Sequence, residues 1–244
     1  MSSPQRRRDA RHASGEPAAP PKAPLSAERI TSAALALVAE EGYDALTMRS
    51  LATRLGTGPA SLYAHVVNKA DLDELLIGRL CRDVLLPTPE PNRWREQITD
   101  VCVQLRDRYL AYPGISRAAL AIDVTDLDVL RVNEGMLAIL IGAGIAPQTA
   151  AWAIDALFLY VGAYAMDVAA AQGGGGDSRH HGSRQRADLI ARFENLPSDR
   201  FPQIRAHARA LTSGTEHERF SFTLDLLLRG LPDSSAQAAP SPTA

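Results

Sequence analysis

The side chains best suited to intermolecular contact lie on a short segment, Pro59–His65, that follows a glycine turn. Tyr63 can set its hydroxyl against a phosphate or its ring edge against a thymine methyl group. Ser61, Ala64 and His65 are the other exposed positions of this segment. We therefore expect these residues to contact DNA.

Catalytic chemistry has much weaker support in the sequence. There is no nucleophile elbow, phosphate-binding loop, metal pair or nucleophile and base at a suitable spacing. A helical enzyme that uses Asp155 or Asp167 as a base is a remote alternative.

A helix-turn-helix would position the contact residues. This motif needs a small residue where its two helices cross, a glycine that turns the chain, and an apolar anchor on the second helix. These requirements are met by Ala52, Gly56 and Leu62. We expect Met48–Leu55 to support Pro59–His65, which would enter the major groove.

Local signals place the helices of this region. Ser26 and Thr47 are suitable N-caps, and Gly42 and Gly56 suit helix ends. Pro59 suits the first position of a helix, because it needs no backbone N–H partner there. Three short helices are therefore expected before residue 68.

Longer helices are expected in the rest of the chain. Asn68 can cap a fourth helix, with Asp71 three residues on as in a capping box. The later apolar stripes are Trp94, Ile98, Val101 or Cys102, Leu105 and Tyr109; and Leu130, Asn133, Leu137 and Leu140. The segments 150–171 and 216–229 keep apolar surface after one face is given to the core, which predicts a four-helix contact between two subunits.

The composition favours an all-α protein. Hydrophobic residues make up 45% of the 244 residues and aromatic residues only 5%, which favours helices over sheets. The formal net charge of -2 gives no overall attraction to nucleic acid, so local charge must supply it. Cys81 and Cys102 lack metal or disulfide spacing and are predicted to be buried, inert thiols.

Five segments are expected along the chain. They are a disordered basic arm over 1–24, a helix-turn-helix domain over 25–70, a larger helical dimerisation domain over 71–231, a flexible glycine-rich loop over 172–187 within it, and a disordered tail over 232–244. The arm is either a solvated tail or an element that follows DNA phosphates. The apolar segment 150–171 is interrupted by Asp155 and Asp167, so a soluble, cytoplasmic protein without a membrane span is expected.

Two segments resemble the TetR family of bacterial transcription regulators. The first contains Leu46-Thr47-Met48-Arg49-Ser50-Leu51-Ala52, Leu55-Gly56 and Leu62-Tyr63-Ala64-His65-Val66-Val67-Asn68-Lys69. The second, residues 218–231, is similar to the closing helix of the tetracycline-repressor-like subgroup. The region between them matches only in the order of its helices.

The resemblance assigns roles to individual DNA-binding residues. Arg49 is at the position that binds a guanine through two hydrogen bonds, and Lys69 matches a phosphate-binding lysine. Arg49 as a solvated surface residue and His65 as a packing or capping residue stay open. Pro59 replaces a base-reading glutamine, so the operator sequence cannot be transferred. The expected contact residues are Thr47, Met48, Arg49, Thr57, Gly58, Pro59, Ala60, Ser61, Tyr63, His65 and Lys69.

The resemblance also implies an apolar small-molecule effector in the larger domain. Asn133 and Asp155 would orient this effector or find structural partners, such as Arg108 or Arg131 for Asp155. The other candidates are equally suited to an ordinary core. The candidate lining residues are Val101, Leu105, Asn133, Met136, Leu140, Trp152, Asp155 and Phe158.

No metal or cofactor is expected. Leu85, Val101 and Leu120 stand where the tetracycline repressor orients its drug and chelates magnesium, and apolar side chains cannot bind a hard cation. The adjacent His180 and His181 lack a third ligand.

The sequence as a whole predicts a homodimeric repressor that an apolar small molecule releases from a palindromic double-stranded DNA operator. The same fold without small-molecule sensing, controlled by a protein partner or constitutive, is the alternative.

Overall fold

The computed structural model describes residues 24–121, 125–173 and 178–232, with their side chains except those of 172–185 and 216. Across these ranges the regular structure is helical and no strand occurs, which confirms the predicted all-α class. The expected arm (1–24) and tail (232–244) lie outside the described residues apart from one residue each.

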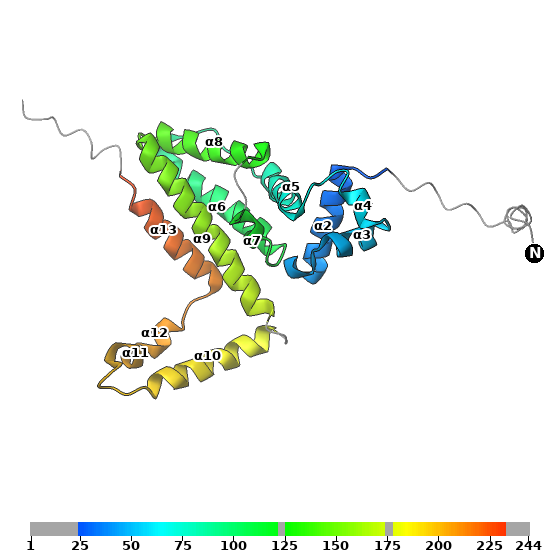
Figure 1. Cartoon of the computed structure of the whole chain (residues 1–244). Helices are drawn as coiled ribbons and strands as arrows, with labels where there is room; N and C mark the ends of the chain where they lie inside the picture. The colour runs from blue at the N-terminus through cyan, green and yellow to red at the C-terminus, as the bar shows by residue number, and fades with distance from the viewer. Residues whose placement is uncertain (1–23, 122–124, 174–177, 233–244) are drawn as a thin grey trace, which may run out of the picture.

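Four elements form a compact unit that we call the head. They are α2 (Ala27–Glu41), η1 (Tyr43–Ala45), α3 (Met48–Leu55) and α4 (Pro59–Leu62). Figure 1 shows them together, to one side of the larger helical part of the chain. The head has the helix-turn-helix order that the sequence predicts.

The predicted caps of the head are present. The Ser26 side chain accepts from the Arg29 N–H at the start of α2, and Thr47 forms a capping box with Ser50 at the start of α3. Gly42 and Gly56 follow these helices with φ of 83° and 62°, which is a conformation that glycine adopts at little cost.

The second helix of the motif is shorter than predicted. Regular α-helix ends at Leu62, and residues 63–65 continue as turns. The His65 N–H donates to the Leu62 carbonyl at 2.9 Å, a tighter bond pattern than that of an α-helix. The expected helix over 59–65 is thus one α-helical turn followed by a tight turn.

The long helix α5 (Lys69–Arg82) leads from the head into the rest of the molecule. As predicted, the Asn68 side chain caps it by accepting from the Asp71 N–H at 2.9 Å. The Asp71 carboxylate, however, accepts from the Val67 N–H and not from Asn68 as a capping box requires.

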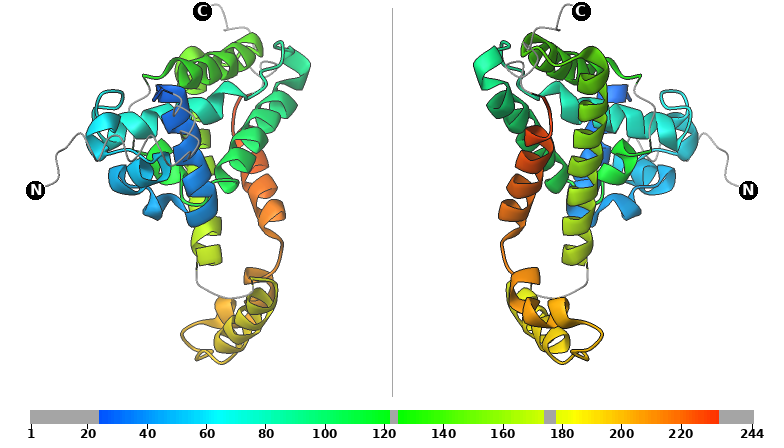
Figure 2. Two further views of the ribbon diagram at one scale, coloured as in Figure 1. Left: turned by 90° about the vertical axis from the view of Figure 1, so that its right-hand side faces the viewer. Right: turned by 90° about the vertical axis from the view of Figure 1, so that its left-hand side faces the viewer.

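The larger domain is built around one central helix, α9 (Pro147–Gly173). It packs against α6, α7, α8 and α13, as Figure 2 shows from two sides. The bounds are η2 Pro91–Arg93, α6 Trp94–Leu110, α7 Ser116–Ala119, α8 Leu127–Gly142 and α13 Glu216–Arg229.

The predicted buried stripe of α8 is only partly correct. The helix buries Val129, Val132, Met136, Ile139 and Leu140, whereas Leu130 is exposed and Asn133 and Leu137 are half-buried. α8 carries apolar residues on more than one face, so its own period does not determine which face turns inward. Its neighbours α5, α6 and α9 determine the face.

Helices α9 and α13 divide into a core face and an exposed face, as predicted. In α9 the buried face includes Ile154, Leu157 and Val161, while Trp152 and Leu159 are exposed. In α13 the buried side chains are Phe220, Leu224 and Leu228, and the exposed ones include Phe222 and Leu226.

Among the described residues, one segment, Pro147–Ala171, is long and apolar enough to cross a membrane by length and composition alone. The expectation that Asp155 and Asp167 exclude it on these grounds is therefore wrong. The core helix of a soluble protein meets the same criterion, and this segment packs among four helices of the larger domain.

The expected flexible loop over 172–187 is mostly helical. Helix α10 begins at Ser178 and continues to Glu194, followed by α11 (Pro202–Ala206) and α12 (Ala208–Leu211). These three helices pack on one another and lie apart from the main bundle. The prediction weighted the glycine run, but the arginines, glutamine and alanines after it are good helix formers.

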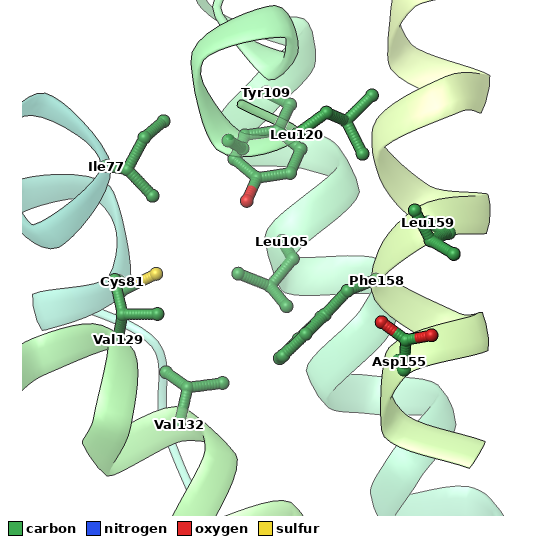
Figure 3. A pocket seen from close by; sticks show the side chains of 11 residues that line it. Ile77, Cys81, Leu105, Tyr109, Leu120, Val129, Val132, Asp155, Phe158 and Leu159 are labelled. Atoms are coloured by element: carbon green, nitrogen blue, oxygen red, sulfur yellow. The ribbon is translucent and has the colours of Figure 1, made fainter. Parts of the chain in front are cut away.

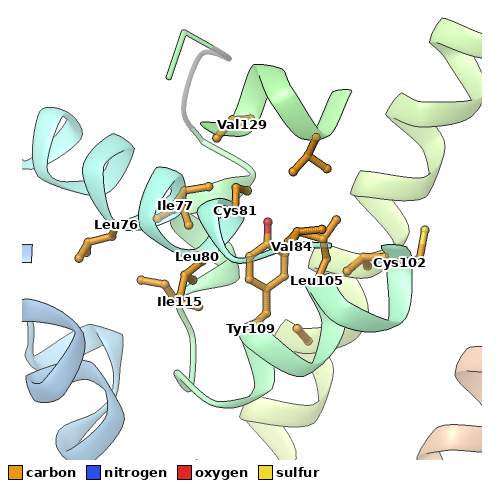
Figure 4. Packing of buried hydrophobic residues seen from close by; sticks show 14 of the residues in the cluster. Leu76, Ile77, Leu80, Cys81, Val84, Cys102, Leu105, Tyr109, Ile115 and Val129 are labelled. Atoms are coloured by element: carbon orange, nitrogen blue, oxygen red, sulfur yellow. The ribbon is translucent and has the colours of Figure 1, made fainter. Parts of the chain in front are cut away.

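The core of the larger domain is formed where α5, α6 and α8 meet (Figure 4). Cys81 and Cys102 are buried and free there, as predicted. Burial raises the pKa of each thiol to about 12, so neither is a thiolate near neutral pH.

A glycine allows α5 to approach the start of α8 closely. A Cβ on Gly78 would contact the carboxyl group of Asp126. That carboxyl caps α8 by accepting from the N–H groups of Asp128 and Val129, at 2.8 and 3.2 Å.

We therefore expect Gly78→Ala to displace the Asp126 cap and to lower the free energy of unfolding by about 1 to 2 kcal/mol, despite the better helix propensity of alanine. Gly58→Ala is the matched control, because a Cβ there meets no atom within 4 Å. Urea unfolding measures both variants. A Gly78→Ala variant as stable as Gly58→Ala would contradict this packing.

Candidate DNA interface and ligand cavity

Arg49 is a free cation at the start of α3. Its side chain is exposed and forms no hydrogen bond or ion pair within the part of the chain that the structure describes. Arg54, on the same helix, is bound by the Glu40 carboxylate through contacts of 2.7 and 2.5 Å. Arg49 is therefore available to an external anion or base edge, and Arg54 is engaged internally.

The other predicted DNA contacts are mostly exposed. Thr47, Gly58, Pro59, Ala60, Ser61 and His65 are exposed, Tyr63 is 53% exposed, and Met48 and Thr57 are half-buried. Met48 packs against the core of the head, which leaves it less surface for DNA. The exposure of His65 favours a contact role over the packing role.

Lys69 is the predicted contact with the most internal bonding. Its ammonium group pairs with Asp73 one turn along α5 and donates to the Tyr43 hydroxyl at 2.8 Å. The Tyr43 hydroxyl in turn donates to the Asp73 carboxylate at 2.8 Å. Two of the three N–H donors of Lys69 are used by these contacts, and one remains for a phosphate. The phosphate-binding role of Lys69 stays a prediction.

We call these three residues the Tyr43–Lys69–Asp73 cluster. It joins η1 of the head to α5 of the larger domain. Burial, followed by the hydrogen bond to Asp73, raises the pKa of Tyr43 far above its usual value. The phenol therefore stays protonated and keeps its donor role.

A second connection joins the head to the short helix α7. The Tyr43 N–H donates to the Pro113 carbonyl at 2.9 Å, just before α7. Arg117 on α7 pairs with Asp44 of the head at 2.5 Å. This exposed ion pair contributes little stability, but with the backbone bond it fixes where α7 meets the head.

A cavity of about 200 Å³ lies between the helices of the larger domain (Figure 3). Its walls come from α5, α6, α8, α9 and the end of α7. They are almost entirely apolar. The lining residues are Ile77, Cys81, Leu105, Tyr109, Ala119, Leu120, Val129, Val132, Asp155, Phe158 and Leu159.

Three of the eight predicted ligand contacts line this cavity, namely Leu105, Asp155 and Phe158. The other five do not. Val101, Met136 and Leu140 are fully buried core residues, and the half-buried Asn133 donates to the Val129 carbonyl of its own helix at 3.1 Å. Trp152 is 69% exposed on the other face of α9.

These corrections share one physical cause. The sequence shows that a helix is amphipathic, but a residue of the core and a residue of a cavity wall have the same apolar character. Trp152 and Phe158 lie on one helix, and only the packing of α9 places the first outside and the second inside.

The prediction also missed several wall residues. Ile77 carried no sequence signal, Cys81 was expected only as a buried thiol, and Tyr109 was expected on an apolar stripe. Leu120 was considered only as a replacement for a metal ligand. The one signal that could have identified Tyr109 is its hydroxyl, because a polar group on a buried stripe needs a partner.

Asp155 is the only charged residue of the cavity wall. Neither of the partners proposed for it binds it: Arg131 donates to the carbonyls of Cys81, Arg82 and Val84, and Arg108 to that of Asp83. Among the described residues Asp155 has no hydrogen bond or ion pair.

The described residues include no group of three His, Cys, Asp or Glu side chains that could hold a metal ion. The side chains of His180 and His181 lie outside the described ones. Leu85, the residue at one of the drug-orienting positions, is exposed and away from the cavity wall.

Both parts of the chain match known families. Residues 30–74 match the family described as bacterial regulatory proteins, tetR family, and residues 86–234 match the tetracyclin repressor-like C-terminal domain.

Individual relatives agree with these matches. The chain is 31% identical to tetracycline repressor protein class G of Vibrio anguillarum, over 82% of this chain and 90% of that protein. It is 32% identical to an HTH-type transcriptional regulator of Saccharopolyspora erythraea, over 49% of this chain but only 51% of that protein. The crystal structure of Streptomyces coelicolor ActR in complex with actinorhodin has a TM-score of 0.77 and 33% identity, covering 85% of this chain and 95% of ActR.

The head and the cavity together define a ligand-responsive DNA-binding regulator. The chain belongs to the TetR family of transcription regulators, with a C-terminal domain of the tetracycline-repressor-like kind. The relatives reported above are regulators rather than enzymes.

The free guanidinium of Arg49 leads to a prediction about DNA binding. Arg49→Ala should weaken binding to an operator selected from random duplexes by about 1 to 3 kcal/mol and relax the preference at one base position. Arg54→Ala, whose side chain is already bound by Glu40, should change affinity much less. Fluorescence anisotropy at fixed salt compares the two variants. Equal losses would contradict the assignment of Arg49 to a base.

Proposed function

We propose that this protein is a repressor that leaves a palindromic operator when an apolar, ring-bearing molecule enters the cavity. One observation carries the proposal: the two elements that hold the head, α5 and α7, are also walls of the cavity. On α5, Asp73 binds the head and Ile77 lines the cavity one turn away. On α7, Arg117 binds the head, and Leu120 directly after the helix lines the cavity.

This arrangement supplies a physical route for regulation. A ligand changes DNA affinity only if it binds one arrangement of the heads more tightly than the other. Expansion of the cavity moves Ile77 and Leu120, and the Tyr43–Lys69–Asp73 cluster and the Arg117–Asp44 pair pass that movement to the head. The spacing of two heads on a palindrome then changes.

The class of ligand follows from the cavity wall. Apart from Asp155 and the Tyr109 hydroxyl, the wall consists of aliphatic and aromatic groups and a neutral thiol, and Phe158 offers a ring for stacking. ActR, which has a similar fold, was crystallised with actinorhodin. The wall supports an apolar effector over a metal chelate, and the ActR complex supports a small-molecule effector for this fold.

The size of the cavity has a further consequence. Its volume of about 200 Å³ is below the roughly 300 to 1,000 Å³ typical of sites for drug-sized ligands. A ligand of several rings must therefore push side chains aside. Leu120, which is 40% exposed and follows α7, is one wall residue that can be displaced toward solvent.

The exposed faces of α9 and α13 support a homodimer. Trp152 on α9, and Phe222 and Leu226 on α13, are large apolar side chains that the single chain leaves exposed. Such a surface on two neighbouring helices suits a four-helix contact with a second copy. A dimer also matches a palindromic operator, and we place the protein in the cytoplasm with the chromosome.

Operator release is the test of the proposed function. A panel of aromatic compounds of one to four rings, together with the larger molecule actinorhodin, is titrated into the complex of wild-type protein with its selected operator. We expect at least one compound to release the operator. For that compound, Val132→Phe, which places a ring in the cavity, should raise the concentration needed at least tenfold without changing operator affinity.

Leu130→Phe is the matched control, because Leu130 lies on the same helix and is exposed. It should behave as the wild type does. If no compound releases the wild type, or if Val132→Phe is released at the wild-type concentration, the cavity is not the effector site.

The dimer leads to a separate prediction. Phe222→Glu puts a charge on the exposed face of α13 and should shift the protein from dimer to monomer at micromolar concentration. Leu227, the more obvious leucine in the sequence, is unsuitable because it packs against the core. Leu127→Glu, an exposed position on α8, is the control. Sedimentation velocity measures the three proteins, and a dimeric Phe222→Glu would rule out this face.

A further inference from the structure

Tyr109 is a polar residue on the inner wall of the cavity whose hydrogen-bonding capacity is unused. Its side chain is only 8% exposed. Figure 3 shows its hydroxyl pointing into the space between Ile77, Cys81 and Leu105. Within the described residues, this hydroxyl has no hydrogen-bond partner.

This hydroxyl can donate a hydrogen bond to an acceptor on a bound molecule. Buried hydroxyl groups in folded proteins are nearly always hydrogen-bonded, and the Tyr109 hydroxyl is not among the atoms that are closed off without a partner, so a molecule in the cavity can reach it. Burial raises the pKa of Tyr109 well above its usual value, so the phenol keeps its proton. The neighbouring Cys81 thiol is also protonated, since its pKa is raised to about 12.

The opposite wall of the cavity carries a hydrogen-bond acceptor, which complements the Tyr109 donor. Asp155 lies on α9, across the cavity from α5, and its side chain is exposed and without a partner among the described residues. A carboxylate only accepts hydrogen bonds. The cavity therefore presents a donor at its buried side, an acceptor at its exposed side, and apolar walls between them.

We propose that Tyr109 determines effector specificity by donating its hydroxyl hydrogen to a carbonyl oxygen of the bound molecule. The effector class is then an aromatic ketone or quinone that also carries a hydroxyl group, which faces Asp155. This inference rests on the proposed function, because it takes the cavity to be the effector site.

A carbonyl fits the buried end better than a hydroxyl does. If a ligand hydroxyl donated to the Tyr109 oxygen, the phenol hydrogen would still lack an acceptor on a wall formed by Ile77, Cys81 and Leu105. A carbonyl uses that hydrogen and brings no donor of its own. An acceptor with a spare lone pair is tolerated more often than an orphaned donor.

Three small probes with the same two-ring skeleton test the inference. They are 6-hydroxy-1-tetralone, with a carbonyl and a hydroxyl at opposite ends, 1-tetralone, with the carbonyl only, and 5,6,7,8-tetrahydro-2-naphthol, with the hydroxyl only. Equilibrium dialysis measures their affinities for the full chain as wild type, Tyr109→Phe and Asp155→Asn.

We expect Tyr109→Phe to weaken both ketones about threefold to tenfold, the range of one net hydrogen bond, and to leave the naphthol unchanged. Asp155→Asn should weaken the two hydroxyl-bearing probes and spare 1-tetralone. Tyr112→Phe, at a half-buried tyrosine outside the cavity wall, is the matched control and should bind all three as the wild type does.

Equal affinity of 1-tetralone for wild type and Tyr109→Phe overturns the inference, and so does a loss confined to the naphthol. Neither outcome affects the proposed function, because the cavity would still bind the probes. If the wild type binds none of the probes at millimolar concentration, the cavity does not take hydroxylated aromatic ketones and the inference is overturned, whereas the proposed function is decided by the operator-release assay. A comparison on wild type alone adds a test independent of any variant: 1-tetralone should bind more tightly than tetralin, which lacks the carbonyl, and equal binding overturns the donor role.

Discussion

The buried carboxylate of Asp73 is the group on which the arrangement of head and larger domain depends. Only 8% of this residue is exposed, and a buried charge must be paired and hydrogen-bonded. Its partners are Lys69, from its own helix, and the hydroxyl of Tyr43, from the head. The head cannot turn away from α5 without removing one of these partners, so the orientation of the DNA-binding surface is tied to the position of α5.

The same constraint explains how a small cavity can control DNA binding. Asp73 and Ile77 are separated by about one helical turn, or roughly 6 Å along the axis, so the cavity wall and the head contact belong to one rigid element. A second connection runs from the cavity wall through α7 to the same residue of the head, because the Pro113 carbonyl, just before α7, accepts from the Tyr43 N–H. Two short helical routes therefore meet at one residue of the head, and no long pathway through the core is needed.

The sequence predicts those features of this structure that depend on a few neighbouring residues, and it does not predict those that depend on which helices pack together. The caps Ser26 and Thr47 and the turn glycine Gly56 act within a few residues, so the helix starts and the helix-turn-helix order of the head could be predicted, although its second helix ends earlier than expected. The inward face of α8 and the outward position of Trp152 depend on which helices surround them, and the amphipathic period carries no such information. The cavity could not be predicted for the same reason, because its wall combines five helices and includes Tyr109, which the sequence shows only as one more member of a buried stripe.

The central claim is that the Tyr43–Lys69–Asp73 cluster couples the cavity to the head, and thermodynamic linkage tests it most directly. The effector that releases the operator is titrated into the wild type and Tyr43→Phe, each with and without operator DNA. In the wild type, the effector should lower operator affinity by the same factor by which the operator lowers effector affinity. In Tyr43→Phe, which removes only the bridging hydroxyl and leaves the α7 contacts in place, each separate affinity should remain while both factors fall together below the wild-type value. A Tyr43→Phe protein with the wild-type coupling factor would contradict the account.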